Sequence, residues 1–107
     1  MSLGWKQSFR NFETYLRLEK SLSENSIKAY LNDVIKLEKY FIETNSEITP
    51  DLVTYSDLKA FLLWYSSDNH NTRTQSRVLS GVRAFYKFLL IEGEIEENPA
   101  SLIESKK

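Results

Sequence analysis

The fold of this 107-residue chain is decided by residues 72–92, which read TRTQSRVLSGVRAFYKFLLIE. On a helical wheel turned by about 100° per residue, the large apolar side chains of this segment share one arc and the polar side chains share the other. The apolar arc consists of Val78, Leu79, Val82, Phe85, Tyr86 and Leu89. Gly93 follows at the place where a left-handed helix cap is favoured. We therefore predict a long helix here, whose apolar face must be covered by other helices.

Two more helices are predicted near the start of the chain. The first covers residues 5–20, and the apolar residues that share its main arc are Trp5, Phe9, Phe12 and Leu16. Ser23 is a suitable N-cap for the second helix, which extends to about residue 44. The buried stripe of the second helix is formed by Ile27, Tyr30, Leu31, Val34, Leu37 and Phe41.

A third helix is predicted after a connection that spans residues 45–53 and contains Pro50. Thr54 and Asp57 have the spacing of a capping box, and Thr72 with Gln75 repeats this spacing before the last helix. The apolar face of the third helix consists of Tyr55, Leu58, Phe61, Leu62 and Tyr65. Each apolar stripe needs another helix to cover it, so we predict an all-α, compact four-helix domain built from two helical hairpins.

The composition excludes several classes of protein. Hydrophobic residues make up 41% of the chain and aromatic residues 13%, with a net charge of −1, which favours a folded chain over a disordered one. The absence of Cys and the single His exclude a disulfide framework, a Cys-based zinc site and a His-rich metal cluster, so we expect no cofactor. No apolar run approaches the roughly 20 residues that span a bilayer. Residues 1–10 also lack the pattern of a signal peptide, so we expect a cytoplasmic protein with no membrane partner.

The charges are unevenly distributed along the chain. Residues 43–68 contain five acidic residues and one basic residue, Lys59, and residues 92–97 add four more acids. The segment between them has no acid and carries four cations, Arg73, Arg77, Arg83 and Lys87. This bias favours contact with a nucleic acid, and an ordinary solvated helix face is the alternative.

The polar side of the segment 72–92 is a narrow strip of small residues, Ser76, Ser80 and Ala84, bordered by these cations. Short side chains let a helix enter a DNA major groove, while long flanking Arg and Lys side chains reach phosphates or base edges. Thr74 lies near the helix N-terminus, where free amides and hydroxyls suit a phosphate. The second predicted helix has a weaker version of this pattern, formed by Ser26, Lys28, Asn32, Lys36 and Lys39.

Three segments in order carry a family resemblance. They are LSENSIKAY at residues 22–30 followed by Asp33, RVLSGVRAFYKFL at residues 77–89, and EG at residues 92–93 followed by NPA at residues 98–100. Together they resemble the N-terminal core-binding domain of tyrosine recombinases, and the resemblance is closest to the Xer-like and phage or transposon integrase branch. Two positions depart from the pattern. Ser26 stands where many members have Thr, and Gly81 stands where Ala is commoner, a change that costs about 0.5–1 kcal/mol of helix stability.

The resemblance implies an orthogonal, SAM-like bundle that clamps one face of a recombination-site duplex. It implies that residues 1–100 form the core-binding domain and that residues 101–107 begin a linker to a separate catalytic domain. In the family that domain contributes Arg, Lys, His-x-x-Arg, a further His or Trp, and the Tyr nucleophile. The chain stops about seven residues after Ala100, so we expect a fragment that binds DNA and does not cleave it. The implied partners are double-stranded DNA, the catalytic domain of the same polypeptide and other recombinase protomers.

The sequence leaves several roles open. The candidate DNA contacts are Ser26, Lys28, Asn32, Lys36, Arg73, Thr74, Arg77, Ser80, Arg83 and Lys87. His70 and Arg73 have His-x-x-Arg spacing, but they precede the fourth helix of the wrong domain and we assign them no catalytic role. The alternative function is a helical protein–protein interaction module that uses Trp64, which is either core or interface, and the acidic connection. Glu38 falls inside an apolar arc, where it needs a partner or access to solvent.

Overall fold

The computed structural model describes residues 4–66 and 72–103. Its helices are α1 (Trp5–Leu18), α2 (Glu24–Glu43), the single 3-10 turn η1 (Pro50–Leu52), α3 (Tyr55–Ser66) and α4 (Thr72–Ile91). The predicted helix boundaries agree with these to within two residues. No β-strand occurs in the described residues, and no helix among them has both the length and the apolar character needed to cross a membrane.

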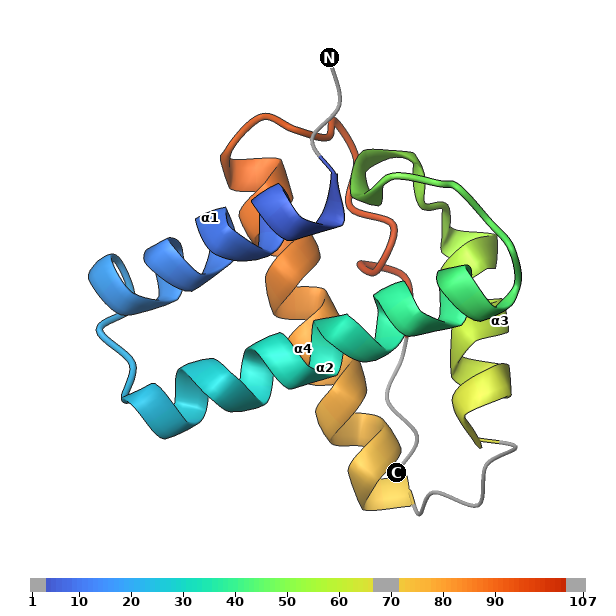
Figure 1. The fold of residues 1–107 in the computed structure, drawn as a ribbon, viewed down its shortest axis with the longest axis horizontal. Coiled ribbons are helices and arrows are strands. Elements are labelled where there is room, and N and C mark those ends of the chain that lie inside the picture. Colours follow the sequence, from blue (N-terminus) through green and yellow to red (C-terminus); the bar gives the residue numbers. More distant parts are fainter. Residues whose placement is uncertain (1–3, 67–71, 104–107) are drawn as a thin grey trace.

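The four α-helices form two antiparallel hairpins that cross each other (Figure 1). One hairpin consists of α1 and α2, and the other consists of α3 and α4. The most extensive contact in the molecule lies between α2 and α4, one helix from each hairpin. The radius of gyration of 13.1 Å matches that of a compact chain of about 100 residues. The predicted all-α, four-helix orthogonal bundle is therefore confirmed.

Local capping determines where two of the helices begin. The Ser23 hydroxyl accepts a hydrogen bond from the backbone N–H of Ser26 at 3.2 Å, as predicted for α2. At α3, the Thr54 N–H donates to Oδ2 of Asp57 at 2.9 Å and the Asp57 N–H donates to the Thr54 hydroxyl at 3.1 Å, so the predicted capping box is confirmed. The side chain of Thr72 and residues 67–71 lie outside the described part of the chain, as does the cap predicted there for α4.

The predicted arc of α4 forms the centre of the core. All six of its apolar residues are buried, and they pack with Phe12, Leu16, Ile27, Val34, Leu37, Phe41, Leu58, Phe61, Tyr65 and Phe88. Phe12 and Phe85 meet edge to face with ring centroids 5.3 Å apart. Three buried residues lie outside the helices: Val53, Ala100 and Ile103. The core thus includes a side chain three residues beyond the expected domain boundary at residue 100.

The connection between α2 and α3 is fixed by two hydrogen bonds from aromatic side chains. Nε1 of Trp5 donates to the carbonyl of Ile48 at 2.9 Å, and the buried Tyr86 hydroxyl donates to the carbonyl of Pro50 at 3.0 Å. Burial raises the pKa of Tyr86 well above its usual value, so the hydroxyl stays protonated and available as a donor. A segment that lacks helical periodicity is thereby held against α1 and α4.

Gly81 lies in the middle of α4, which continues through it without a break. The residue is buried, and a Cβ atom built on it would lie 2.5 Å from both Cβ and Oδ2 of Asp33 in α2. Real Cβ atoms do not approach other atoms this closely. The glycine that lowers intrinsic helix stability therefore allows α2 and α4 to approach each other closely where they cross.

We expect Gly81→Ala to destabilise the protein. Alanine is the better helix former, but its methyl group overpacks the crossing against Asp33, and overpacking usually costs about 1–3 kcal/mol. Ser80→Ala, which changes the neighbouring exposed position of α4, should leave stability nearly unchanged. Denaturant unfolding of both variants measures the difference. A Gly81→Ala protein as stable as the wild type contradicts the close packing.

Candidate nucleic-acid interface

The predicted DNA contacts divide into exposed and half-buried groups. Six of them are exposed: Lys28 and Asn32 in α2, and Arg73, Arg77, Ser80 and Lys87 in α4. Four are half-buried: Ser26, Lys36, Thr74 and Arg83. All ten lie on α2 and α4, the two helices with the most extensive mutual contact. Ser26 also has a structural role, because its backbone N–H completes the N-cap of α2.

The strip of small residues on α4 is only partly open to solvent. Ser80 is exposed, whereas Ser76 and Ala84 are half-buried and Ala84 packs against the core. The Ser80 hydroxyl donates to the Ser76 carbonyl at 3.1 Å, which leaves its lone pairs as acceptors. The strip is therefore exposed at Ser80 and half-buried at Ser76 and Ala84, and Ala84 packs partly against the core.

The helices bring three side chains together around the buried carboxylate of Asp33, and we name the four residues the Asp33 cluster: Asp33 and Lys36 of α2, Tyr65 of α3, and Arg77 of α4. Asp33 is only 2% exposed. Its Oδ1 atom lies 3.6 Å from Nη1 of Arg77 and 3.8 Å from Nζ of Lys36. Nζ of Lys36 is also 6.0 Å from the centre of the Tyr65 ring. The cluster thus joins cations from two helices that are far apart in sequence.

Burial raises the pKa of Asp33, and the positive charges of Arg77 and Lys36 oppose this effect without overcoming it. The Oδ1 atom has no hydrogen-bond partner among the described residues. The carboxylate therefore interacts with the two cations through charge and not through hydrogen bonds. This attraction does not fully offset the free-energy cost of removing the carboxylate from water. Such a group restrains the positions of its cationic neighbours while contributing little stability of its own.

The sequence predicts that Glu38 needs a partner or access to solvent, and Glu38 is half-buried and keeps access to solvent. The sequence did not single out Asp33, which is the acid that is buried among the described residues. A signal was present in the spacing, because Asp33 follows Tyr30 by three residues and precedes Leu37 by four, which places all three on one side of the helix. Gly81 in α4 was a second signal, because a residue without a side chain leaves room for Asp33 to pack against the helix.

We expect the stability of the protein to depend on pH through Asp33. Because its pKa is raised in the folded state, the folded protein takes up a proton more readily than the unfolded chain. The Asp33→Asn variant cannot take up this proton. As pH falls from 7 toward 3.8, the ordinary pKa of an Asp side chain, the melting temperature of the wild type should therefore rise relative to that of Asp33→Asn. Thermal unfolding of both proteins across this range measures the difference, and a difference that does not change with pH contradicts the prediction.

The structure also bears on the possible metal site and on two further residues that the sequence singled out. No group of three or more His, Cys, Asp or Glu residues among them is arranged to hold a metal ion. Trp64 is half-buried and packs on Tyr40, with ring centroids 5.3 Å apart, so the structure places it beside the core. His70 lies outside the described residues.

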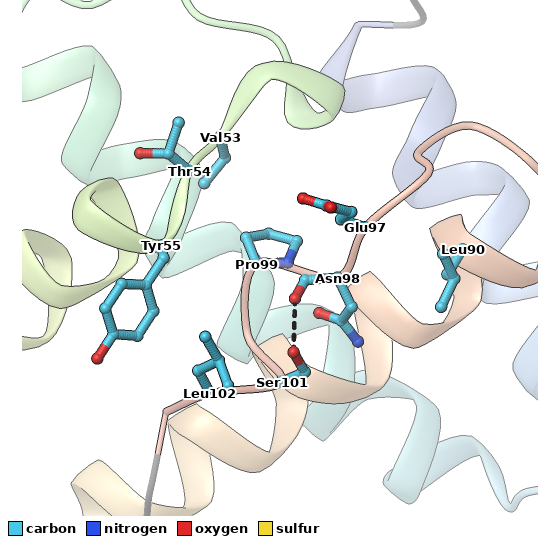
Figure 2. Close-up of a pocket in the computed structure, with 9 residues that line it drawn as sticks. All are labelled: Val53, Thr54, Tyr55, Leu90, Glu97, Asn98, Pro99, Ser101 and Leu102. Carbon is cyan, nitrogen blue, oxygen red and sulfur yellow. Dashed lines mark hydrogen bonds between the residues drawn. The ribbon is translucent and has the colours of Figure 1, made fainter.

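An open hollow of about 690 Å³ lies away from the Asp33 cluster. Figure 2 shows the start of α3 on one side of it and the turn at residues 98–102 on the other. The hydroxyl of Ser101 donates to the carbonyl of Asn98 at 2.9 Å and holds this turn. Among the described residues that line the hollow, Glu97 is the single acid and no Asp, His, Lys or Arg accompanies it, so these residues do not supply the paired groups of an acid–base site.

Comparison with known protein families shows which family this chain is related to. The profile of the family described as the phage integrase, N-terminal SAM-like domain matches residues 9–93. The chain belongs to this family. The resemblance drawn from the sequence motifs is thereby confirmed, and both α2 and α4 lie inside the matched SAM-like domain.

Relatives of this SAM-like domain are tyrosine recombinases. A "Tyrosine recombinase XerC" of Pediococcus pentosaceus is 34% identical over 97 residues, which cover 90% of this chain and 32% of that protein. A "Tyrosine recombinase XerD" of Oceanobacillus iheyensis is 29% identical over 100 residues, which cover 94% of this chain and 34% of that protein. A "Tyrosine recombinase XerC" of Anoxybacillus flavithermus is 35% identical over 96 residues. The chain spans about a third of the length of these relatives.

Proposed function

We propose that this SAM-like domain binds double-stranded DNA as the recognition domain of a site-specific tyrosine recombinase. The observation that carries the proposal is the crossing of α2 and α4, where a cation from each helix, Lys36 and Arg77, lies beside Asp33. Phosphate contacts from Lys and Arg supply most of the affinity of such domains for a duplex. The net charge of −1 does not oppose this function, because the acids lie mainly in other segments.

The side chains assigned to the duplex have two roles. Exposed cations at the ends of the proposed face, Lys28, Arg73 and Lys87, reach phosphates on either side of a groove. Ser80 and Asn32 are short polar side chains between them, which suits contact with base edges. Lys36 and Arg83 are half-buried, Arg77 is exposed beside Asp33, and Ser26 and Thr74 lie near the N-termini of their helices. The two helices together form the proposed face.

Catalysis belongs to the remaining length of the recombinase in this proposal. The relatives are about three times as long as the matched region, which leaves room for a separate catalytic domain. Strand cleavage by a tyrosine nucleophile would occur in a separate domain of the same polypeptide, and further recombinase protomers would share the recombination site. This domain would hold the duplex in place during DNA recombination or integration.

We expect the protein to bind a labelled duplex with an affinity that decreases with salt. If about four phosphates are neutralised, the logarithm of the association constant should fall against the logarithm of the salt concentration with a slope of about −3.6. Titration at several salt concentrations measures this slope. Absence of duplex binding by the folded protein, or binding that does not respond to salt, contradicts the proposal and favours the interaction module.

Removal of exposed cations from the proposed face should weaken binding without unfolding the protein. We expect Arg73→Ala combined with Lys87→Ala to lower duplex affinity about tenfold or more and to make the salt slope less steep by about two, because each side chain neutralises about one phosphate. Lys6→Ala combined with Arg10→Ala is the matched control, since it removes one Lys and one Arg from exposed positions on α1. Equal losses in the two double variants would show that overall charge, and not this face, governs binding.

A further inference from the structure

We infer that Asp33 is a positioning residue that holds Lys36 and Arg77 as a pair, and that this pair binds a single phosphate group of the DNA backbone. The inference rests on the proposed function and adds to it a residue that does not itself touch DNA. It follows from the geometry at the crossing of α2 and α4, where one buried carboxylate oxygen lies within 4 Å of a cationic nitrogen from each helix.

The carboxylate is a fixed point in the fold. Asp33 is 2% exposed, and its Cβ and Oδ2 atoms lie against Gly81, where even a methyl group would not fit. The side chain therefore has little freedom to follow its cations into solvent. Lys36 and Arg77 must instead come to the carboxylate, and the separation of their nitrogens cannot exceed the sum of their two distances to Oδ1.

The ion pairs leave the donors of both cations available. The distances of 3.6 and 3.8 Å are longer than hydrogen bonds, and Oδ1 of Asp33 has no hydrogen-bond partner among the described residues. The side chain of Arg77 is 53% exposed and that of Lys36 is 32% exposed. Attraction to the carboxylate thus restrains both heads without using the N–H groups that a phosphate oxygen accepts from.

Two cations and one anion leave one net positive charge at this point, which matches one backbone phosphate of charge −1. Restraining both side chains before binding also reduces the conformational entropy that they lose on binding. The third helix adds Tyr65, whose ring lies 6.0 Å from Nζ of Lys36 and limits where the ammonium can move. The site is therefore organised by side chains from three helices.

The inference predicts a result opposite to that of simple charge counting. Asp33→Asn removes a negative charge near the DNA, which by electrostatics alone tightens binding. If Asp33 positions the pair, the same variant should bind the duplex about fivefold or more weakly, with a salt slope less steep by about one. Glu43→Gln is the matched control, because it removes one negative charge from an exposed position of the same helix and should bind as well as the wild type or slightly better.

The pairing of Lys36 and Arg77 has its own test, which does not depend on the stability of Asp33→Asn. If both bind one phosphate, Lys36→Ala combined with Arg77→Ala should make the salt slope less steep by about one, and two separate phosphate contacts would change it by about two. In that double variant, Asp33→Asn should no longer weaken binding. Melting temperatures of all variants are measured in parallel so that only folded proteins are compared.

The outcomes separate this inference from the proposed function. If the wild type binds no duplex, the proposed function fails and the inference fails with it. If the wild type binds with the expected salt dependence and the slope changes by about two in the Lys36 and Arg77 double variant, only the inference is overturned. The same conclusion follows if a folded Asp33→Asn protein binds as tightly as the wild type or more tightly.

Discussion

α2 and α4 cross where the side chain of Asp33 packs directly on Gly81, and this contact constrains the rest of the structure. It is the close approach within the most extensive interhelical contact, so it determines how the two hairpins meet. It also buries a carboxylate whose Oδ1 atom has no hydrogen-bond partner in the described part of the chain, and the nearby charges of Arg77 and Lys36 offset part of that cost. A single packing contact thus links the geometry of the bundle to the position of two cations on its surface.

The remainder of the fold keeps this crossing in place. Trp5, Phe9 and Phe12 of α1 pack on Phe85, and the Phe12 and Phe85 rings meet edge to face on the core side of α4. The hydrogen bonds from Trp5 to Ile48 and from Tyr86 to Pro50 hold the long connection against the helices. With its apolar side fixed in this way, α4 can keep Arg73, Arg77 and Lys87 exposed without disturbing the core. Burial on one side of the helix therefore leaves the other side free to carry exposed cations.

The distribution of charge explains how a slightly acidic domain can belong to a family of DNA recombinases. The acids of residues 43–68 and 92–97 lie on the segments that flank α4 in sequence, whereas α4 carries no acid. At physiological salt, exposed charges separated by more than about 8 Å are largely screened from one another. A duplex phosphate would therefore respond chiefly to the cations close to it and not to the net charge of the domain. Asp33 is the exception, because it is an acid placed next to those cations.

The sequence by itself determined the helices, the N-terminal caps of α2 and α3, the apolar arc of α4 and the family, because helical periodicity and capping depend on residues within a few positions of each other. It could not determine that Asp33 and not Glu38 is buried, that Gly81 is needed for a close approach, or that Ile103 reaches the core. Each of these depends on which helix covers a given face and at what point along its length. A helical wheel gives the direction of a side chain about its own axis, and only the packing of α2 against α4 brings Lys36 and Arg77 to the same carboxylate.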